Sequence, residues 1–241
     1  MSGASSRLAR REVLPEILDD LPENDPRAVA SRGDLRRVNA LMFQAGITRG
    51  LLTRHLAAPP RRILEIGAGD GSLMLALARR LHTRWPAVDL FLLDRQSLVT
   101  PERIAEFAAL GWTVHVVEAD IFAWSRQASA ERFDAITTNL FLHHFENGPL
   151  SELLGDLAPM APVFVATEPR RAAFPLFAAS LLWCIGANDV TRHDAAVSVR
   201  AGFAGRELSS LWPAHKPSKL EEGARGLFTH AFAAVSTTSP A

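Results

Sequence analysis

Residues 63–73 read Ile-Leu-Glu-Ile-Gly-Ala-Gly-Asp-Gly-Ser-Leu, and this stretch decides the fold that the sequence predicts. An apolar strand ends in three alternating glycines, and a helical pattern follows them. Glycine lets the backbone turn sharply and lie against a ligand without a Cβ in the way, while the start of the next helix offers unpaired N–H groups. The stretch therefore predicts a nucleotide-binding turn between a strand and a helix.

The spacing of the glycines narrows the choice of ligand. A dinucleotide-binding turn needs the pattern G-x-G-x-x-G, whose third glycine would fall at position 72, where this chain has Ser72. Residues 65–71 instead read E-x-G-x-G-x-G, which resembles motif I of the class I S-adenosylmethionine (SAM) methyltransferases. The resemblance extends over about residues 60–170.

Strand and helix patterns alternate through the middle of the chain. We expect strands at residues 63–66, 88–94, 113–117, 135–138 and 163–167, with candidate closing strands near 218–221 and 227–235. Strands separated by helices imply parallel pairing with right-handed crossovers, and hence an α/β three-layer sandwich. The resemblance implies the Rossmann-like methyltransferase fold, with a seven-stranded, mostly parallel sheet that ends in an antiparallel hairpin.

Helical patterns flank this core on both sides. A short amphipathic piece is expected at about residues 13–21, helices at 34–55, an apolar helix-like insertion at 172–200 and a further helix at 201–211. We therefore predict a helical N-terminal arm or lid over residues 1–56 and a SAM-binding methyltransferase domain over residues 57–241. Within that domain we expect a helical cap insertion at about residues 170–200.

Composition limits the partners of the chain. Its 26 basic and 26 acidic residues cancel, so no overall field attracts a nucleic acid. Cys184 is the single cysteine, which excludes an intrachain disulfide, and its apolar neighbours predict a buried side chain. Without a secretory signal or a bilayer-spanning stretch, we expect a cytoplasmic protein with no membrane span, and a homodimer is compatible with the sequence.

Acidic residues at the ends of successive strands are the second group of candidate site residues. Open α/β sheets bind their ligands at these ends, and although one such acid is more often simply solvated, three beside the glycines indicate a site. The resemblance implies that Glu65 orders the ammonium of SAM, that Asp94 accepts hydrogen bonds from both ribose hydroxyls, and that Asp120 meets the adenine amino group. The cofactor-binding residues that it implies are Glu65, Gly67, Ala68, Gly69, Gly71, Asp94, Arg95, Asp120, Ile121 and Asn139.

Candidate catalytic residues follow the fourth strand in a Leu-His-His-Phe run similar to that of many small-molecule methyltransferases. The resemblance implies that one histidine works with an acid at the end of the fifth strand, here Glu168. A phenol with a pKa of about 10 is mostly neutral at pH 7, and a histidine is an efficient base for its proton. We place His144 slightly ahead of His143. The alternative is that one histidine caps a helix and the other packs beneath the cap.

The insertion bears on the acceptor substrate. His193, beside Asp194, is a second candidate base, although a surface turn explains the pair equally well. The apolar residues of the insertion together predict an apolar acceptor, because such a lid desolvates a charged one only at high cost. These residues are Phe174, Phe177, Leu181, Leu182, Trp183 and Ile185. We expect no metal, because no H-x-x-x-H pattern or His/Asp cluster is present.

We therefore expect an enzyme that moves the methyl group of SAM, leaving S-adenosylhomocysteine (SAH), to a small, apolar, aromatic hydroxylated compound of secondary metabolism, with O-methylation favoured. C-methylation of a quinone-like or polyketide-like ring fits the same residues. A nicotinamide-dependent oxidoreductase fits less well, because the chain has no tyrosine and has Ser72 in place of the glycine. A non-catalytic SAM-binding protein is a further alternative.

Overall fold

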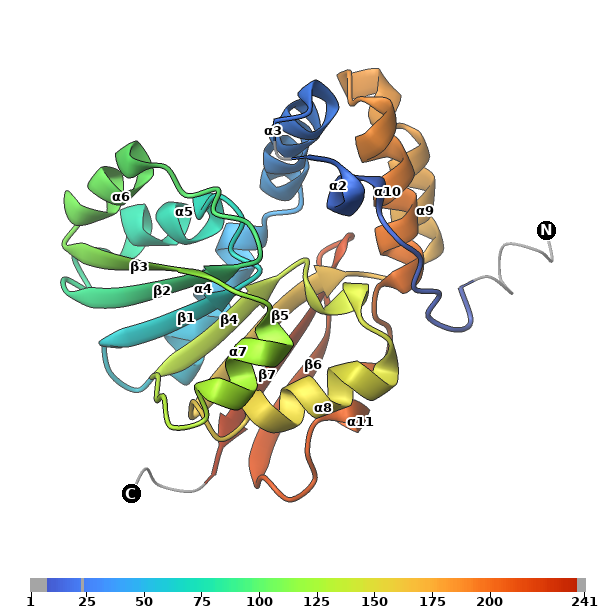
Figure 1. Ribbon diagram of the computed structural model, residues 1–241. Coiled ribbons are helices and arrows are strands. Elements are labelled where there is room, and N and C mark those ends of the chain that lie inside the picture. The colour runs from blue at the N-terminus through green and yellow to red at the C-terminus, as the bar shows by residue number, and fades with distance from the viewer. Residues whose placement is uncertain (1–7, 23, 238–241) are drawn as a thin grey trace.

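The computed structural model describes residues 8–22 and 24–237, and its strands form one sheet in the order β3-β2-β1-β4-β5-β7-β6 (Figure 1). The strands are β1 (Arg62–Ile66), β2 (Val88–Asp94), β3 (Trp112–Glu118), β4 (Ala135–Asn139), β5 (Val163–Pro169), β6 (Ser218–Arg225) and β7 (Thr229–Ser236). Strands β1 to β5 pair in parallel, and β7 pairs antiparallel with both β5 and β6. The predicted seven-stranded, mostly parallel sheet and its closing hairpin are confirmed.

Helices cover both faces of the sheet. One face carries α4 (Gln44–His55), α5 (Ser72–Leu81) and α6 (Pro101–Ala108), and the other carries α7 (Ile121–Gln127), α8 (Asn147–Leu157) and α11 (Glu207–Leu211). Side chains of β1 alternate between the two cores, with Ile63 in the first and Leu64 and Ile66 in the second. Because β1 is buried on both faces, its sequence is almost continuously apolar.

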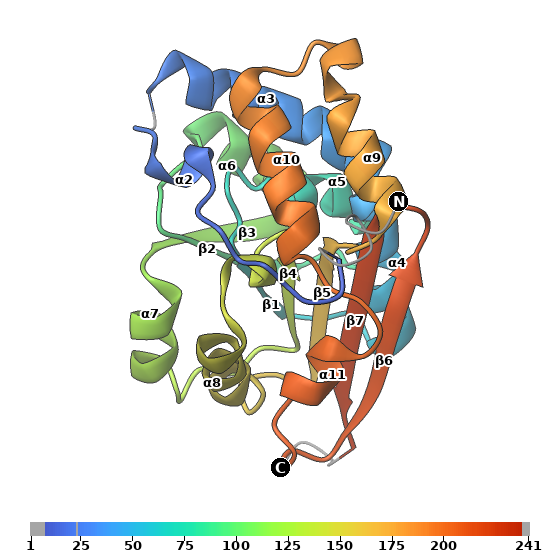
Figure 2. The same ribbon diagram turned by 90° about the vertical axis from the view of Figure 1, so that its right-hand side faces the viewer.

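The remaining helices stand over the carboxyl edge of the parallel strands (Figures 1 and 2). They are α2 (Ile17–Asp20), α3 (Pro26–Leu41), α9 (Ala173–Ser180), the short 3-10 helix η2 (Leu182–Ile185) and α10 (Asp189–Ala201). Strand order reverses between β1 and β4, and open α/β sheets bind ligands beside such a reversal. None of the described helices is long and apolar enough to cross a membrane.

Two helical predictions need correction. The helix expected at 201–211 is interrupted, because α10 ends at Ala201 and a Cβ on Gly202 would lie 2.3 Å from the carbonyl oxygen of Pro169. Phe203 then forms a bridge with Arg170, so this segment lies against the end of β5. The piece expected at 13–21 is helical only in α2, and residues 1–7 of the predicted arm lie outside the described residues.

The lid has two halves from opposite parts of the chain, and polar groups join them. The carboxylate of Asp34 on α3 accepts hydrogen bonds from the backbone N–H of Asn188 (2.9 Å) and the hydroxyl of Thr191 (3.1 Å). The hydroxyls of Ser31 and Thr191 are 2.9 Å apart. All of these groups except Asn188 are buried, so α3 and α10 are held together at fixed positions.

An N-terminal strap, residues 8–20, runs beside α10 and into α2 (Figure 2). The backbone N–H of Glu12 donates to the carbonyl oxygen of Arg200 at 3.2 Å. The buried carboxylate of Asp194 accepts two successive backbone N–H groups of α2, at 2.9 and 3.0 Å. The strap is therefore fastened to the second half of the lid.

Gly67 is the position where a side chain would disturb the turn most. Its φ is +69°, and a Cβ would lie 2.4 Å from the Phe141 ring, whereas Gly69 has a φ of +53° and open space around it. We expect Gly69→Ala to cost about 1–2 kcal/mol from the left-handed backbone alone and Gly67→Ala to cost clearly more. Thermal unfolding of both ligand-free variants measures the difference, and equal losses of stability would contradict the Phe141 contact.

Candidate active site

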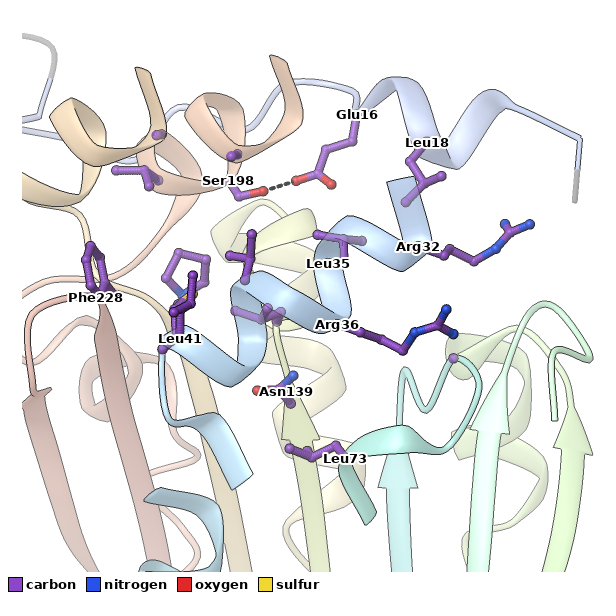
Figure 3. A pocket seen from close by; sticks show the side chains of 18 of the residues that line it. Glu16, Leu18, Arg32, Leu35, Arg36, Leu41, Leu73, Asn139, Ser198 and Phe228 are labelled. Carbon is purple, nitrogen blue, oxygen red and sulfur yellow. Dashed lines mark hydrogen bonds between the residues drawn. The ribbon is translucent and has the colours of Figure 1, made fainter. Parts of the chain in front are cut away.

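A cavity of about 610 Å³ lies between the carboxyl edge of the sheet and the helices above it. Figure 3 shows lid side chains such as Leu35 and Leu41 over Asn139 and Leu73, which come from the sheet side. Glu65, His143 and residues of the glycine turn line the same cavity. Apolar residues supply most of the lid lining: Leu35, Val38, Leu41, Met42, Pro175, Ala178, Ala179, Leu181, Leu182, Ile185 and Val199, and Phe228 of the β6–β7 turn adds to it.

The glycine turn is built on hydrogen bonds to β2. The backbone N–H groups of Gly67 and Ala68 donate to the carbonyl oxygen of Leu93, at 2.9 and 3.1 Å. One carboxylate oxygen of Asp94 accepts the N–H of Gly69 at 2.8 Å, and the other accepts the N–H of Gln96 at 3.0 Å. Asp94 therefore fixes the turn as well as ending the strand, so its position is set before any ligand binds.

Glu65 is the most unusual group on the floor of the cavity. Its side chain comes from near the carboxyl end of β1 and is 2% exposed, and its Oε2 atom has no hydrogen-bond partner within the described part of the chain. Burial, together with the negative charges of Asp70 and Asp94, raises the pKa of Glu65 well above its ordinary value. A buried carboxylate without a partner fits a ligand that brings a positive charge, such as the ammonium of SAM.

Of the other predicted cofactor residues, Gly67, Ala68, Gly69 and Asn139 line the cavity, whereas Gly71, Asp94, Arg95, Asp120 and Ile121 do not. Asn139 lines the cavity, and its Oδ1 accepts the Thr167 hydroxyl at 2.9 Å. The exposed Asp120 caps α7 by accepting the N–H groups of its first turn, both at 3.0 Å, and the next residue, Ile121, is buried. Arg95 is exposed just beyond Asp94 and does not line the cavity.

Glu168 holds the histidine turn in place. The carboxylate is fully buried and accepts the backbone N–H groups of Leu142 (2.9 Å), Phe141 (3.2 Å) and His143 (3.4 Å). Its Oε2 atom is also 2.8 Å from the Nδ1 atom of His143. We ranked His144 slightly ahead from the sequence, but the structure brings His143 to Glu168. Of the two histidines, His143 is therefore the one that contacts Glu168.

His144 makes a different contact. Its Nδ1 atom is 2.9 Å from the carbonyl oxygen of Phe141, and because a carbonyl only accepts hydrogen bonds, Nδ1 carries the proton. The imidazole rings of His144 and His143 lie against each other, with centroids 4.2 Å apart. Both Nε2 atoms face one carboxylate of the strap, that of Glu16.

Glu16 is a site residue that we missed in the sequence. Its Oε1 atom is 3.4 Å from Nε2 of His143, its Oε2 atom is 3.5 Å from Nε2 of His144, and its side chain is 12% exposed. It also accepts a hydrogen bond from the hydroxyl of Ser198 on α10 (Figure 3). Glu16 lies in a polar segment without a motif, so only the three-dimensional packing reveals its role.

The carboxylates strongly perturb the charge of the site. Burial alone would lower the pKa of His143, but the nearby carboxylates of Glu16 and Glu168 outweigh it and raise this pKa to about 9. Burial would likewise raise the pKa of Glu16, but His143 and His144 outweigh it and hold this pKa well below its ordinary value. In the ligand-free protein His143 is therefore an imidazolium between two carboxylates at neutral pH.

Two sequence expectations about the lid do not match the structure. His193 does not reach the cavity, because its side chain is 51% exposed and its Nδ1 atom lies 3.0 Å from Asp194, which anchors the strap. Cys184 is exposed rather than buried, because the helical insertion breaks after it at Gly186, which has a φ of +73°. Cys184 instead lines the cavity from η2.

The question of a metal ion centres on the histidine pair. Within the described ranges, Glu16, His143 and His144 form a group whose ligand atoms all lie within 4.8 Å of one another, close enough to hold an ion. A proton on Nε2 of His143 competes with such an ion, and the raised pKa favours the proton. Our expectation that the site works without a metal stays a prediction.

Comparison with known proteins agrees with this geometry. Residues 63–160 match a family model described as a methyltransferase domain. A curated relative, the ribosomal protein L11 methyltransferase of Rhodopseudomonas palustris, is 32% identical over 127 residues, which are 50% of this chain and 41% of that protein. The chain thus spans less than half the length of this relative.

Two solved structures share the fold. An O-methyltransferase family protein from Burkholderia thailandensis has a TM-score of 0.62 at 15% identity, covering 98% of this chain and 68% of that one. The N-terminal domain of EvdMO1, crystallised in the presence of SAH and D-fucose, has a TM-score of 0.50 at 16% identity, covering 80% and 82%. At these identities the likeness bears on the fold alone.

The raised pKa of His143 predicts how stability changes with pH. The native protein keeps this proton where the unfolded chain has released it, so the contribution is complete below the unfolded pKa of about 6.5 and is lost as pH rises through the folded value. We expect the melting temperature to fall as pH rises from 6.5 to about 9. Circular dichroism melts should show a smaller fall in His143→Gln, and an unchanged slope would contradict the assignment.

Proposed function

Because residues 63–160 form a methyltransferase domain of the class I, SAM-dependent kind, we propose that the protein methylates a small, apolar, aromatic hydroxylated molecule, with O-methylation favoured. One observation carries this proposal. A single cavity joins the unpartnered carboxylate of Glu65 to the histidine pair beneath an apolar lid. Donor and acceptor can therefore meet in one largely apolar space.

The floor of the cavity fits the donor. When bound, SAM supplies a methyl group already activated by its sulfonium, so the protein mainly has to align the acceptor. Glu65 would pair with the ammonium, Asp94 with the ribose hydroxyls, and Asp120 beside Ile121 with the adenine. The open space at Gly69 leaves room for the ligand against the backbone. The remaining proposed cofactor residues are Gly67, Ala68, Gly71, Arg95 and Asn139.

The histidine turn fits the acceptor. Glu168 accepts the Nδ1 proton of His143 and thereby points Nε2 toward the cavity, which is the arrangement that makes a histidine a base. We assign the removal of the hydroxyl proton to His143, with Glu168 as its positioning residue. His144, whose Nδ1 proton is held by the Phe141 carbonyl, presents a second Nε2 acceptor beside it.

The lid supports an apolar acceptor rather than a charged one. Leu35, Val38 and Leu182 are typical of its lining, and burying a charged group against such residues without a partner is costly. C-methylation of an electron-rich ring would use the same residues, with His143 deprotonating a neighbouring hydroxyl. The exposed rings of Phe174, Phe177 and Trp183 lie outside the cavity lining, so they do not define the acceptor.

Glu65→Gln separates ligand binding from folding. Because the folded pKa of Glu65 is raised, ionised Glu65 destabilises the ligand-free protein at neutral pH, and the substitution should raise its melting temperature. The same change should weaken SAM binding about 10- to 100-fold, because it removes a charged hydrogen-bond acceptor. Calorimetric titration with SAM measures this, with the exposed Glu118→Gln as the control. Unchanged SAM affinity would contradict the ammonium assignment.

His143→Gln tests the reaction itself. We expect it to lower the turnover of simple phenols at least 100-fold, the usual contribution of a general base, while leaving SAM affinity nearly unchanged. Transfer of a labelled methyl group from SAM to a panel of phenols measures the rate, with EDTA added to one series. Wild-type rates that collapse with EDTA would show that a metal is required. Full activity in His143→Gln would move the base to His144.

A further inference from the structure

The strap places Glu16 where the acceptor has to be. We propose that Glu16 is a displaceable carboxylate that blocks His143 in the acceptor-free protein, and that the acceptor hydroxyl must displace it to reach Nε2. This inference rests on the proposed function, and it assigns the strap a direct part in acceptor binding. It makes arrival of the acceptor the event that frees the base.

Only one nitrogen of His143 is available to an acceptor. Nδ1 is held by Glu168, which is fully buried in the sheet and anchored by three backbone N–H groups. Nε2 is buried on the opposite side of the ring, 3.4 Å from the Oε1 atom of Glu16, and both residues line the cavity. The acceptor hydroxyl and the Glu16 carboxylate therefore compete for the same side of the ring.

The contact between Glu16 and His143 is close but poorly directed. Among the described residues, Nε2 of His143 finds no partner with the geometry of a hydrogen bond, although it is buried. The Glu16 carboxylate is shared between both histidines and the hydroxyl of Ser198, so no single bond fixes it. A hydroxyl that docks on Nε2 can therefore replace a loose ion pair with a directed hydrogen bond.

The two carboxylates differ in how they are supported. Glu168 ends a central strand, whereas Glu16 is the residue before the four-residue helix α2 in the strap. The strap is tied to the lid through Asp194 and Arg200, and to the histidine turn through Arg11, whose guanidinium donates to the backbone carbonyls of His143 and Phe145. Glu16 can thus leave His143 by side-chain rotation while the backbone of the strap and Glu168 stay in place.

The charged groups around His143 come from three elements. Glu16 faces it from the strap, Glu168 from β5, and His144 from its own turn. The guanidinium of Arg11, also in the strap, donates to the backbone carbonyl of His143 at 3.2 Å. With both carboxylates in place the ring keeps its second proton, in line with its raised pKa. Removing Glu16 leaves one carboxylate, which lowers the affinity of the ring for that proton.

Proton release and methyl transfer follow the displacement of Glu16. Displacement of Glu16 lets His143 release its Nε2 proton to solvent, and the acceptor hydroxyl donates its hydrogen bond to the freed lone pair. As the acceptor oxygen forms its bond to the methyl carbon, the carbon–sulfur bond of the donor breaks and its electron pair stays on sulfur. The hydroxyl proton moves to Nε2 of His143, which returns the ring to the imidazolium form that Glu16 holds.

A titration of His143 by NMR tests the proposal without any turnover. The imidazole signal is followed with pH in SAH-loaded wild type, in Glu16→Gln and in Glu12→Gln, with His143→Gln used only to assign it. Glu12 lies in the same strap but is exposed, so it is a matched control. We expect a midpoint near 9 in wild type and Glu12→Gln, and a fall of about one pH unit or more in Glu16→Gln. An unchanged midpoint in Glu16→Gln overturns the proposal.

A second measurement uses only the wild-type chain, in case the variant does not fold. Adding a phenol that the enzyme methylates to the SAH-loaded protein should lower the His143 midpoint, because the hydroxyl replaces Glu16. A midpoint that stays near 9 with phenol bound overturns the proposal. If no phenol is methylated at all, the proposed function fails, and the Glu16→Gln titration still decides whether this carboxylate controls His143.

Kinetics separate blocking from a merely structural role. The pH profile of kcat/KM reports the free enzyme, so its midpoint should fall in Glu16→Gln. The profile of kcat reports the complex, in which Glu16 has already been displaced, so its midpoint should stay the same. A uniform loss of both parameters with no change in either midpoint would show that Glu16 only supports the fold.

Discussion

The buried carboxylate of Glu168 is the constraint on which the site depends. Burying a carboxylate costs free energy unless its oxygens are hydrogen-bonded, and Glu168 offsets this cost by gathering the backbone N–H groups of residues 141–143. That requirement bends the chain after β4 into its tight turn, in which Leu140 has a φ of +51°. A leucine in the left-handed region is strained, and the Glu168 bonds hold it there.

The same turn also couples the two halves of the active site. Phe141 packs over Gly67, so the backbone that presents the histidines rests on the backbone that would receive the donor. Asp94 completes this unit, because it hydrogen-bonds to the Gly69 N–H from the neighbouring strand. Hydrogen bonds thus fix the loops that follow β1, β2 and β4 relative to one another and to the end of β5. This gives the reaction site the alignment that it needs.

Patterns in the sequence predict the sheet well, because central parallel strands such as β1 and β5 are buried on both faces and therefore read as apolar runs with a turn after them. They also predict Glu65 and Glu168 as strand-end groups, since both follow apolar runs whose carboxyl ends lie at the same edge of the sheet. Periodicity gives no sign of Glu16, which reaches the histidines from a polar segment more than 120 residues away in sequence. It likewise misses the break at Gly202, which follows from a close backbone approach to Pro169.

The long-range fastening of the lid has a consequence for how the molecule is made. The bonds from Asp194 to α2 and from Asp34 to Asn188 join residues separated by more than 150 positions, whereas the glycine turn and the histidine turn close with residues 63–168. During synthesis the bonds that fasten α2 and α3 to the second half of the lid therefore cannot form until the ribosome has passed residue 194. The lid over the acceptor chamber thus closes late in synthesis, and until then its apolar lining is exposed to solvent and to chaperones.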